Sequence, residues 1–194
     1  HFMRVDIWQD EANEILICEG SWNQTLARIR RSEMRPPLRY FLLKFWLNGG
    51  RDTHYLRLPS LFFSVAAVGV FYFVVRERFD EPEARMAALV LACSSFAISS
   101  AHFCRSYSMD LFVTLLAVHA FLSKERRNTV LCELYFVASC TLAAYTTYFF
   151  DFVLLLFVLS DALPIFKGRE KFARFVRSYV PLGLLTSPLA LLAP

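Results

Sequence analysis

The chain has 194 residues, is 56% hydrophobic and 16% aromatic, and has a mean hydropathy of +0.41. A soluble domain of this size is usually about 45–50% apolar, so this excess places the chain in the membrane class. The formal net charge of +4 is too small to indicate nucleic-acid binding, and the basic residues stand in short clusters between apolar runs. His1 looks like mid-sequence and Pro194 ends an apolar run, so we expect a fragment that lacks material at both ends.

The first 57 residues are mixed in character and are predicted to form one extracytoplasmic loop. Apolar residues at helical spacing predict one or two amphipathic helices, and they are Leu16, Ile17, Trp22, Leu26 and Ile29. The Pro36-Pro37 pair breaks any helix before it and can begin the next one. Residues 38–47 then mix apolar and basic residues, and they are too few to span a bilayer, which needs about 20 apolar residues. We predict a juxtamembrane helix there that lies in the interface.

Long apolar runs fill residues 58–194 and predict an all-α, multi-pass transmembrane bundle of about six helices. The runs are 58–75, 86–103, 107–122, 130–150, 152–166 and 179–194. Basic residues in the successive loops number three, one, three, none and five, which is the alternation that the positive-inside rule demands. This pattern places loops 76–85, 124–127 and 167–177 in the cytosol. Residues 1–57, Arg105 and the turn at 150–151 then face the other side.

Two charged residues flank the start of the third run and are predicted to belong to a site. Arg105 is the one basic residue of its loop, and Asp110 follows five residues later. Both residues are expected at the non-cytosolic surface of the membrane. Burying an ionisable group in the membrane costs roughly 3 kcal/mol unless the group is paired or faces water. Asp10 and Glu11 are expected on the same side of the membrane. A structural Arg105–Asp110 salt bridge is the alternative, and Asp151 in the external turn either caps a helix or lines the same site.

This combination of charges suits the transfer of a group from a lipid phosphate to an alcohol. A lipid phosphate lies at headgroup depth, where an arginine can bind it bidentately. Such a contact is worth about 4 kcal/mol before desolvation, at an effective dielectric near 20 and about 4 Å. A carboxylate in the adjoining loop can take a proton from an incoming hydroxyl, typically worth about 10²–10⁴ in rate. The stretch Trp8-Gln9-Asp10-Glu11-Ala12-Asn13 supplies two adjacent carboxylates at the expected membrane boundary.

Other polar residues of the apolar runs are predicted to be structural. His119 is predicted to form an interhelical hydrogen bond, and Glu133 and Asp161 to reach water or the basic loop residues. The five cysteines show no metal-binding spacing and are predicted to be small buried hydrophobic residues, with a Cys18–Cys104 disulfide as the alternative.

Five motifs in this order resemble the membrane glycosyltransferases of the GT-C fold. They are Asp10-Glu11-Ala12, Arg35-Pro36-Pro37-Leu38-Arg39-Tyr40, Arg57-Leu58-Pro59-Ser60, Arg105-x4-Asp110 and Tyr145-Thr146-Thr147-Tyr148-Phe149. The nearest resemblance is to glycosyltransferase family 39, with the protein O-mannosyltransferases and the bacterial aminoarabinose transferases. It covers nearly the whole chain but only the amino-terminal part of a family member. It therefore implies a further helix before His1 and more helices after Pro194.

The resemblance implies a role for each matching residue. Asp10 matches the general base on the acceptor, and Glu11 matches its partner, which positions the loop or the acceptor. Arg105 matches an arginine near the donor phosphate. The implied catalytic residues are Asp10 and Glu11, and the implied substrate-binding residues are Arg105, Asp110, Tyr107 and Arg57. The chain departs from the family's pattern in four respects. Arg35 and Thr147 stand where histidine is frequent, Arg39 stands where a tyrosine or small residue is common, and no acidic residue precedes Arg105.

We therefore predict an inverting glycosyltransferase of a bacterial cell membrane that moves a sugar from a polyprenyl-phosphate donor to a hydroxyl acceptor on a protein, lipid or glycan. No cofactor, nucleic-acid partner or metal-ligand set is predicted. Some GT-C enzymes use a divalent ion, so metal binding by Asp10 and Glu11 stays open. One alternative is a transporter that uses Asp110, Glu133 and His119 as a polar path. The other is a scaffold or assembly subunit that needs none of the acidic residues.

Overall fold

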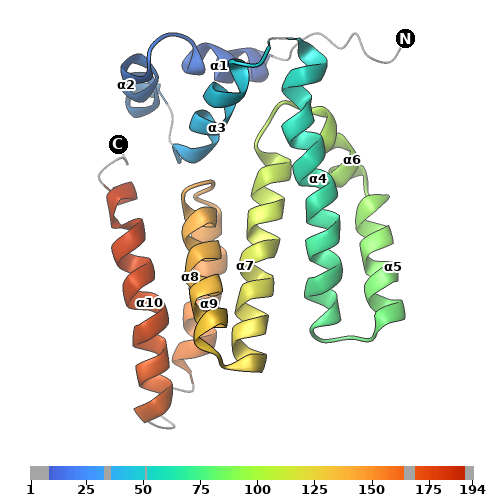
Figure 1. Ribbon diagram of the computed structural model, residues 1–194, viewed down its shortest axis with the longest axis vertical. Coiled ribbons are helices and arrows are strands. Elements are labelled where there is room, and N and C mark those ends of the chain that lie inside the picture. The colour runs from blue at the N-terminus through green and yellow to red at the C-terminus, as the bar shows by residue number, and fades with distance from the viewer. Residues whose placement is uncertain (1–8, 33–35, 51, 164–168, 191–194) are drawn as a thin grey trace.

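The computed structural model of the chain describes residues 9–32, 36–50, 52–163 and 169–190, which form an all-α structure (Figure 1). The predicted helical class is confirmed. The described part of the chain holds ten helices: α1 (Gln9–Cys18), α2 (Trp22–Ser32), α3 (Leu38–Leu47), α4 (Thr53–Arg76), α5 (Glu81–Ala92), α6 (Ser95–His102), α7 (Tyr107–Arg127), α8 (Val130–Ala144), α9 (Phe150–Ala162) and α10 (Arg169–Ala190).

Helices α1, α2 and α3 form a cap over one end of the bundle (Figure 1). The amphipathic helices expected before residue 33 are the pair α1 and α2, and α3 has the bounds predicted for the interfacial helix. Inside the cap, Nζ of Lys44 donates to the carbonyl oxygens of Cys18 and Gly20, both at 2.8 Å, and to Oγ1 of Thr25 at 2.9 Å. Tyr40 is fully buried beside them. Helices α1 and α2 are therefore fixed to α3 by a buried lysine as well as by apolar packing.

Helices α4 to α10 run alongside one another beneath the cap (Figure 1). Their buried core consists mainly of small and aromatic side chains from α7, α8 and α9, among them Ala117, Ala120, Phe136, Cys140 and Phe157. Small residues let backbones approach closely, and α6 approaches α4 through small side chains. Oγ of Ser64 on α4 donates to the carbonyl oxygen of Ala97 on α6 at 3.1 Å.

Helix α4 is the one described helix that is long and apolar enough to cross a membrane by itself, and α5 with α6 passes the same test only as a pair bent by 52°. The expectation of one continuous helix over 86–103 is therefore wrong. Oγ of Ser94 donates to the carbonyl oxygen of Leu91 at 2.7 Å and accepts from the amide of Ala97 at 3.2 Å. This serine ends one helix and caps the next.

The helical run expected over 130–150 is also divided. Helix α8 ends at Ala144, and α9 begins at Phe150 after a turn at 145–149. The turn that was predicted at 150–151 therefore lies several residues earlier, at 145–149. The amide of Leu38 at the start of α3 donates to the carbonyl oxygen of Tyr145 at 3.3 Å, so this turn lies against the cap.

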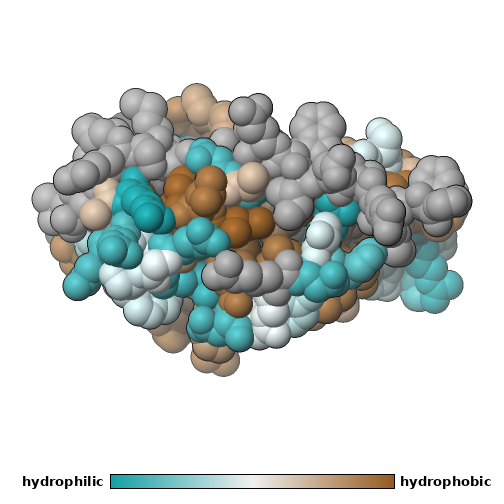
Figure 2. Space-filling model, turned by 90° about the horizontal axis from the view of Figure 1, so that it is seen from above, coloured by the Kyte–Doolittle hydropathy of each residue, from teal (hydrophilic) through white to brown (hydrophobic). Residues whose placement is uncertain are grey.

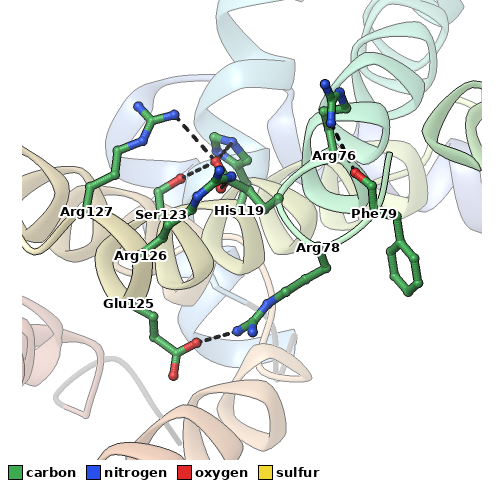
Figure 3. Close-up of polar contacts among 9 residues, drawn as sticks. Arg76, Arg78, Phe79, His119, Ser123, Glu125, Arg126 and Arg127 are labelled. Carbon is green, nitrogen blue, oxygen red and sulfur yellow. Dashed lines mark hydrogen bonds and ion pairs between the residues drawn. The ribbon is translucent and has the colours of Figure 1, made fainter. Parts of the chain in front are cut away.

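The basic ends of α4 and α7 lie together at the end opposite the cap. Arg126 and Arg127 approach the carboxylate of Glu77 to 3.1 and 3.7 Å, with Ser123 donating to it at 3.3 Å (Figure 3). Arg78 forms an ion pair of 2.7 Å with Glu125 (Figure 3). The predicted loops 76–85 and 124–127 thus share one end, as the expected topology requires.

The polar residues predicted to be structural do join helices. A ring nitrogen of His119 lies 3.2 Å from the hydroxyl of Tyr135, and Arg177 donates to Glu133 at 2.6 Å. Lys124 is 2% exposed and pairs with Asp161 at 2.5 Å. Cys18 and Cys140 are buried as expected, whereas Cys93 is exposed, and the alternative of a Cys18–Cys104 disulfide is wrong because both thiols are free.

Candidate active site

A groove of about 770 Å³ lies beneath the cap, with walls contributed by α3 and α4. Most of its lining is apolar and comes from Leu42, Leu43, Phe45, Trp46, Leu56, Leu58, Leu61, Phe62, Phe63, Val65 and Met109. Phe45, Phe62 and Val65 are 69%, 67% and 66% exposed, so these walls also face the surroundings of the bundle. Seen from the cap end, hydrophilic side chains surround a hydrophobic centre (Figure 2).

The polar lining of the groove is one connected cluster at the loop between α6 and α7. It consists of Glu14, Arg39, Ser60, Cys104, Arg105 and Ser106. Oγ of Ser60 on α4 donates to the carbonyl oxygen of Arg105 at 3.3 Å, and Nη1 of Arg39 on α3 donates to Oγ of Ser106 at 2.9 Å. Two helices therefore hold two consecutive residues of the loop that carries Arg105.

Helix α1 holds the same loop through Glu11. This carboxylate is 1% exposed, and its Oε1 accepts from the backbone amide of Cys104 at 2.6 Å. Its Oε2 lies 3.7 Å from Nη2 of Arg57 on α4. Burial raises the pKa of the Cys104 thiol to about 12, and the negative charge of Glu11 acts in the same direction, so this thiol is neutral. Because both of its oxygens have partners on other segments, the buried Glu11 side chain links the cap to the loop between α6 and α7.

Arg39 is the centre of the second contact. Its side chain is 7% exposed, forms an ion pair with Glu14 on α1, and donates to Ser106. Oγ of Ser106 in turn donates to Oδ2 of Asp110 at 3.0 Å. Burial alone would lower the pKa of Arg39, but the charge of Glu14 and its hydrogen bond raise it above the ordinary value. Arg39 is therefore a permanent cation in the groove wall.

The guanidinium of Arg105 is oriented by its neighbour. Its Nη1 donates to the hydroxyl of Tyr107 at 2.5 Å, and its Cζ lies 5.3 Å from the centroid of the tyrosine ring. A cation over an aromatic face is held there electrostatically. Arg105 lines the groove, whereas Tyr107, Arg57 and Asp110 do not.

The protein family is identified by a sequence match that covers most of the chain. Residues 34–191 match the family model of the dolichyl-phosphate-mannose-protein mannosyltransferases. The chain belongs to this glycosyltransferase family. The matched region contains α3 to α10 and most of the groove, and it begins after the acidic motif of α1. No curated protein and no solved structure matches the chain.

Membership of this family confirms the resemblance drawn from the five motifs, and the structure shows how far those motifs come together. Glu11 and Arg57 contact each other, and Arg105, Tyr107 and Asp110 lie along the adjoining loop and helix. Asp10 belongs to the first turn of α1, but its side chain lies outside the described residues, as does Arg35.

Four further polar residues of the groove were not predicted as site residues: Glu14, Ser60, Cys104 and Ser106. Arg39 was noted only as a departure from the family's pattern. One signal was available for Glu14, because it follows Glu11 by three residues and therefore shares its helix face. Arg39 gave a weaker signal as a charged residue in a mostly apolar helix. Its partner Glu14 is 25 positions earlier, and that pairing has no local signature.

Neither a metal centre nor a transport path is indicated by the described side chains. Among these residues, no group of three or more His, Cys, Asp or Glu is arranged to hold a metal ion. Asp110 lies at the cap end, whereas Glu133 pairs with Arg177, and His119 contacts Tyr135. These three residues do not line the groove, so this arrangement does not support the transporter alternative.

Proposed function

We propose that this chain forms the donor site of an inverting glycosyltransferase that moves a sugar from a polyprenyl phosphate to an acceptor hydroxyl. The groove is the observation that carries the proposal. Its walls are apolar, and its polar cluster contains the guanidinium groups of Arg39 and Arg105. A polyprenyl phosphate has an apolar chain and an anionic head, so a single ligand satisfies both parts of the groove.

The proposed reaction is a single displacement. The acceptor oxygen attacks the anomeric carbon while the bond from that carbon to the phosphate oxygen breaks, and the electron pair leaves on the phosphate. Arg105 stabilises the charge that develops on the leaving group. The carboxylate of Asp10 takes the proton of the acceptor hydroxyl. One displacement inverts the configuration at the anomeric carbon.

The proposed setting is a membrane, with residues 1–57 outside the cytoplasm and residues 58–194 forming a multi-pass bundle. Large apolar side chains on the outer surface support this setting. On α4 they include Leu58, Leu61, Phe62, Val65 and Phe73, each more than two-fifths exposed. A soluble protein rarely exposes an apolar area of this extent. Lipid contact at the open side of the groove would also let the donor enter from the bilayer.

Replacing Arg105 tests the donor site. Arg105→Ala should raise the KM for dolichyl phosphate mannose roughly ten- to a hundredfold, the range expected for a lost hydrogen bond to a charged group. The KM for a peptide acceptor containing serine and threonine should change little. Arg85→Ala is the matched control, because Arg85 pairs with Glu81 at the opposite end of the bundle. Equal effects of Arg105→Ala on donor and acceptor would contradict the phosphate contact.

A further inference from the structure

A second hollow lies at the end of the bundle opposite the cap, where α9 ends and α10 begins (Figure 1). Its volume is about 190 Å³. Three helices line it, with Glu125 from α7, Ser160 and Asp161 from α9, and Lys171, Arg174 and Phe175 from α10. None of these residues lines the groove beneath the cap, so the hollow is separate from the proposed donor site.

Both carboxylates of the hollow already have partners. Oδ2 of Asp161 accepts from Nζ of Lys124 at 2.5 Å and from the hydroxyl of Tyr179 at 2.9 Å. Glu125 forms an ion pair of 2.7 Å with Arg78 on the far side of α7 from this hollow's lining (Figure 3). Neither Lys124 nor Arg78 lines the hollow. The two negative charges of the lining are therefore compensated by cations outside it.

The two cations of the lining have no such compensation. Lys171 and Arg174 are three positions apart on α10 and so share one face of that helix. Within the described part of the chain, neither forms an ion pair or a side-chain hydrogen bond. The segment 167–177 as a whole has five basic residues and one acidic residue. With the hydroxyl of Ser160 opposite them, Lys171 and Arg174 form a set of donors and positive charges that suits a phosphate group.

Exposed apolar side chains flank this polar hollow. Leu156 and Leu163 share a face of α9 with Ser160, and they are 64% and 77% exposed. On α10, Phe172 is 55% exposed beside Lys171. The surface around the hollow is therefore apolar, and an occupant with a phosphate and apolar chains would satisfy both parts.

We propose that this hollow binds the phosphate head of an anionic phospholipid, which bridges the ends of α9 and α10 while its acyl chains lie along the exposed leucines of α9. The inference uses the proposed membrane setting but no part of the proposed reaction. Basic loops of multi-pass proteins favour the cytosolic side, and the cytosolic leaflet is the one rich in anionic lipids. Charge and location therefore select the same ligand.

Two short lipids with the same acyl chains isolate the contribution of the head charge. Dioctanoyl phosphatidylglycerol is anionic, and dioctanoyl phosphatidylcholine is zwitterionic. The wild-type protein in an uncharged detergent should bind the anionic lipid roughly tenfold or more tightly, as measured by lipid adducts in native mass spectrometry. Lys171→Gln/Arg174→Gln should abolish this preference. The single variants, which each keep one cation, should each lose part of it.

A second double variant controls for net charge. Arg76→Gln/Arg85→Gln removes two positive charges at the same end of the bundle but outside the hollow, and it should keep the preference for the anionic lipid. Lys171 and Arg174 have no ion pair to lose, so their double variant should unfold at the wild-type temperature in detergent without lipid. Added phosphatidylglycerol should then raise the unfolding temperature of the wild type more than that of this variant.

Three results would overturn the lipid site. They are equal binding of both lipids by the wild type, an unchanged preference in Lys171→Gln/Arg174→Gln, and an equal loss of preference in Arg76→Gln/Arg85→Gln. Inorganic phosphate distinguishes a lipid from a free anion, because at the same concentration as the lipid it should not displace phosphatidylglycerol. Displacement would show that the anion alone is the ligand and would also overturn the proposal. The donor groove is unaffected by each of these outcomes, since Arg105→Ala tests it separately.

Discussion

Glu11 and Asp10 are adjacent acidic residues, yet the structure gives Glu11 a role that an acid–base catalyst could not share. Its two oxygens face the amide of Cys104 and the guanidinium of Arg57, and the side chain is 1% exposed. A carboxylate enclosed in this way cannot reach an acceptor hydroxyl. Glu11 therefore keeps the loop of Arg105 in place, and the proposed base remains Asp10 alone.

These roles predict different outcomes for the two conservative variants. Asp10→Asn should lower kcat by about 10²–10⁴, the usual contribution of a general base, and should leave thermal stability unchanged. Glu11→Gln should weaken the contact with Arg57 and Cys104, which destabilises the protein by about 1–3 kcal/mol. Turnover and thermal unfolding of both variants distinguish the roles. Near-normal turnover of Asp10→Asn would remove the base assignment.

At the scale of the elements, the break between α5 and α6 determines where the Arg105 loop lies. Ser94 closes α5 and caps α6, and Ser64 on α4 holds the first turn of α6 through Ala97. The 52° bend follows from these contacts. Helix α6 then leads directly into the loop that Glu11 and Arg39 hold, so a straight helix would carry this loop to a different position.

Removing the side-chain N-cap of α6 should measure how much Ser94 contributes to the stability of the break between α5 and α6. Ser94→Ala loses the side-chain cap of α6 and should destabilise the protein by about 1 kcal/mol. Ser95→Ala is the matched control, because Ser95 is the exposed neighbouring serine and lies inside the helix. Thermal unfolding of the two variants in the same detergent gives the comparison. Equal destabilisation by both would show that capping by Ser94 does not maintain the break.

Local signals explain which elements could be predicted. The bounds of α3 follow from Pro36 and Pro37 before it and from the Asn48-Gly49-Gly50 turn after it, all of which act within a few residues. The break at Ser94 had no such signal, because hydropathy stays high through it and several serines stand nearby. The groove could not be predicted from the sequence at all, because its ion pair joins Glu14 and Arg39, which lie on different helices. Sequence periodicity predicts the buried faces and the ends of helices, whereas the contacts between Glu14 and Arg39 depend on how the helices pack against one another.

At the scale of the molecule, the two ends of the bundle differ in chemistry. The end opposite the cap is held by ion pairs around Glu77, where burial would raise the pKa of the carboxyl but Arg126 and Arg127 lower it below its ordinary value. The cap end holds the groove and the polar cluster. This polarity fits a protein with a fixed orientation in the bilayer, because basic loops favour the cytosolic side.

Cysteine labelling of intact cells tests that orientation. Ser21→Cys lies in the cap and Glu83→Cys lies at the start of α5, and both positions are exposed. A membrane-impermeant maleimide should label the cap variant in intact cells, and should label the α5 variant only after the membrane is opened. The parent chain is the control for labelling of the native thiols, among which Cys93 is exposed. Its Cys104 should stay unlabelled, because burial raises the pKa of that thiol to about 12. Labelling of Glu83→Cys but not Ser21→Cys in intact cells would invert the topology, place the donor groove on the cytosolic side and contradict the proposed site of sugar transfer.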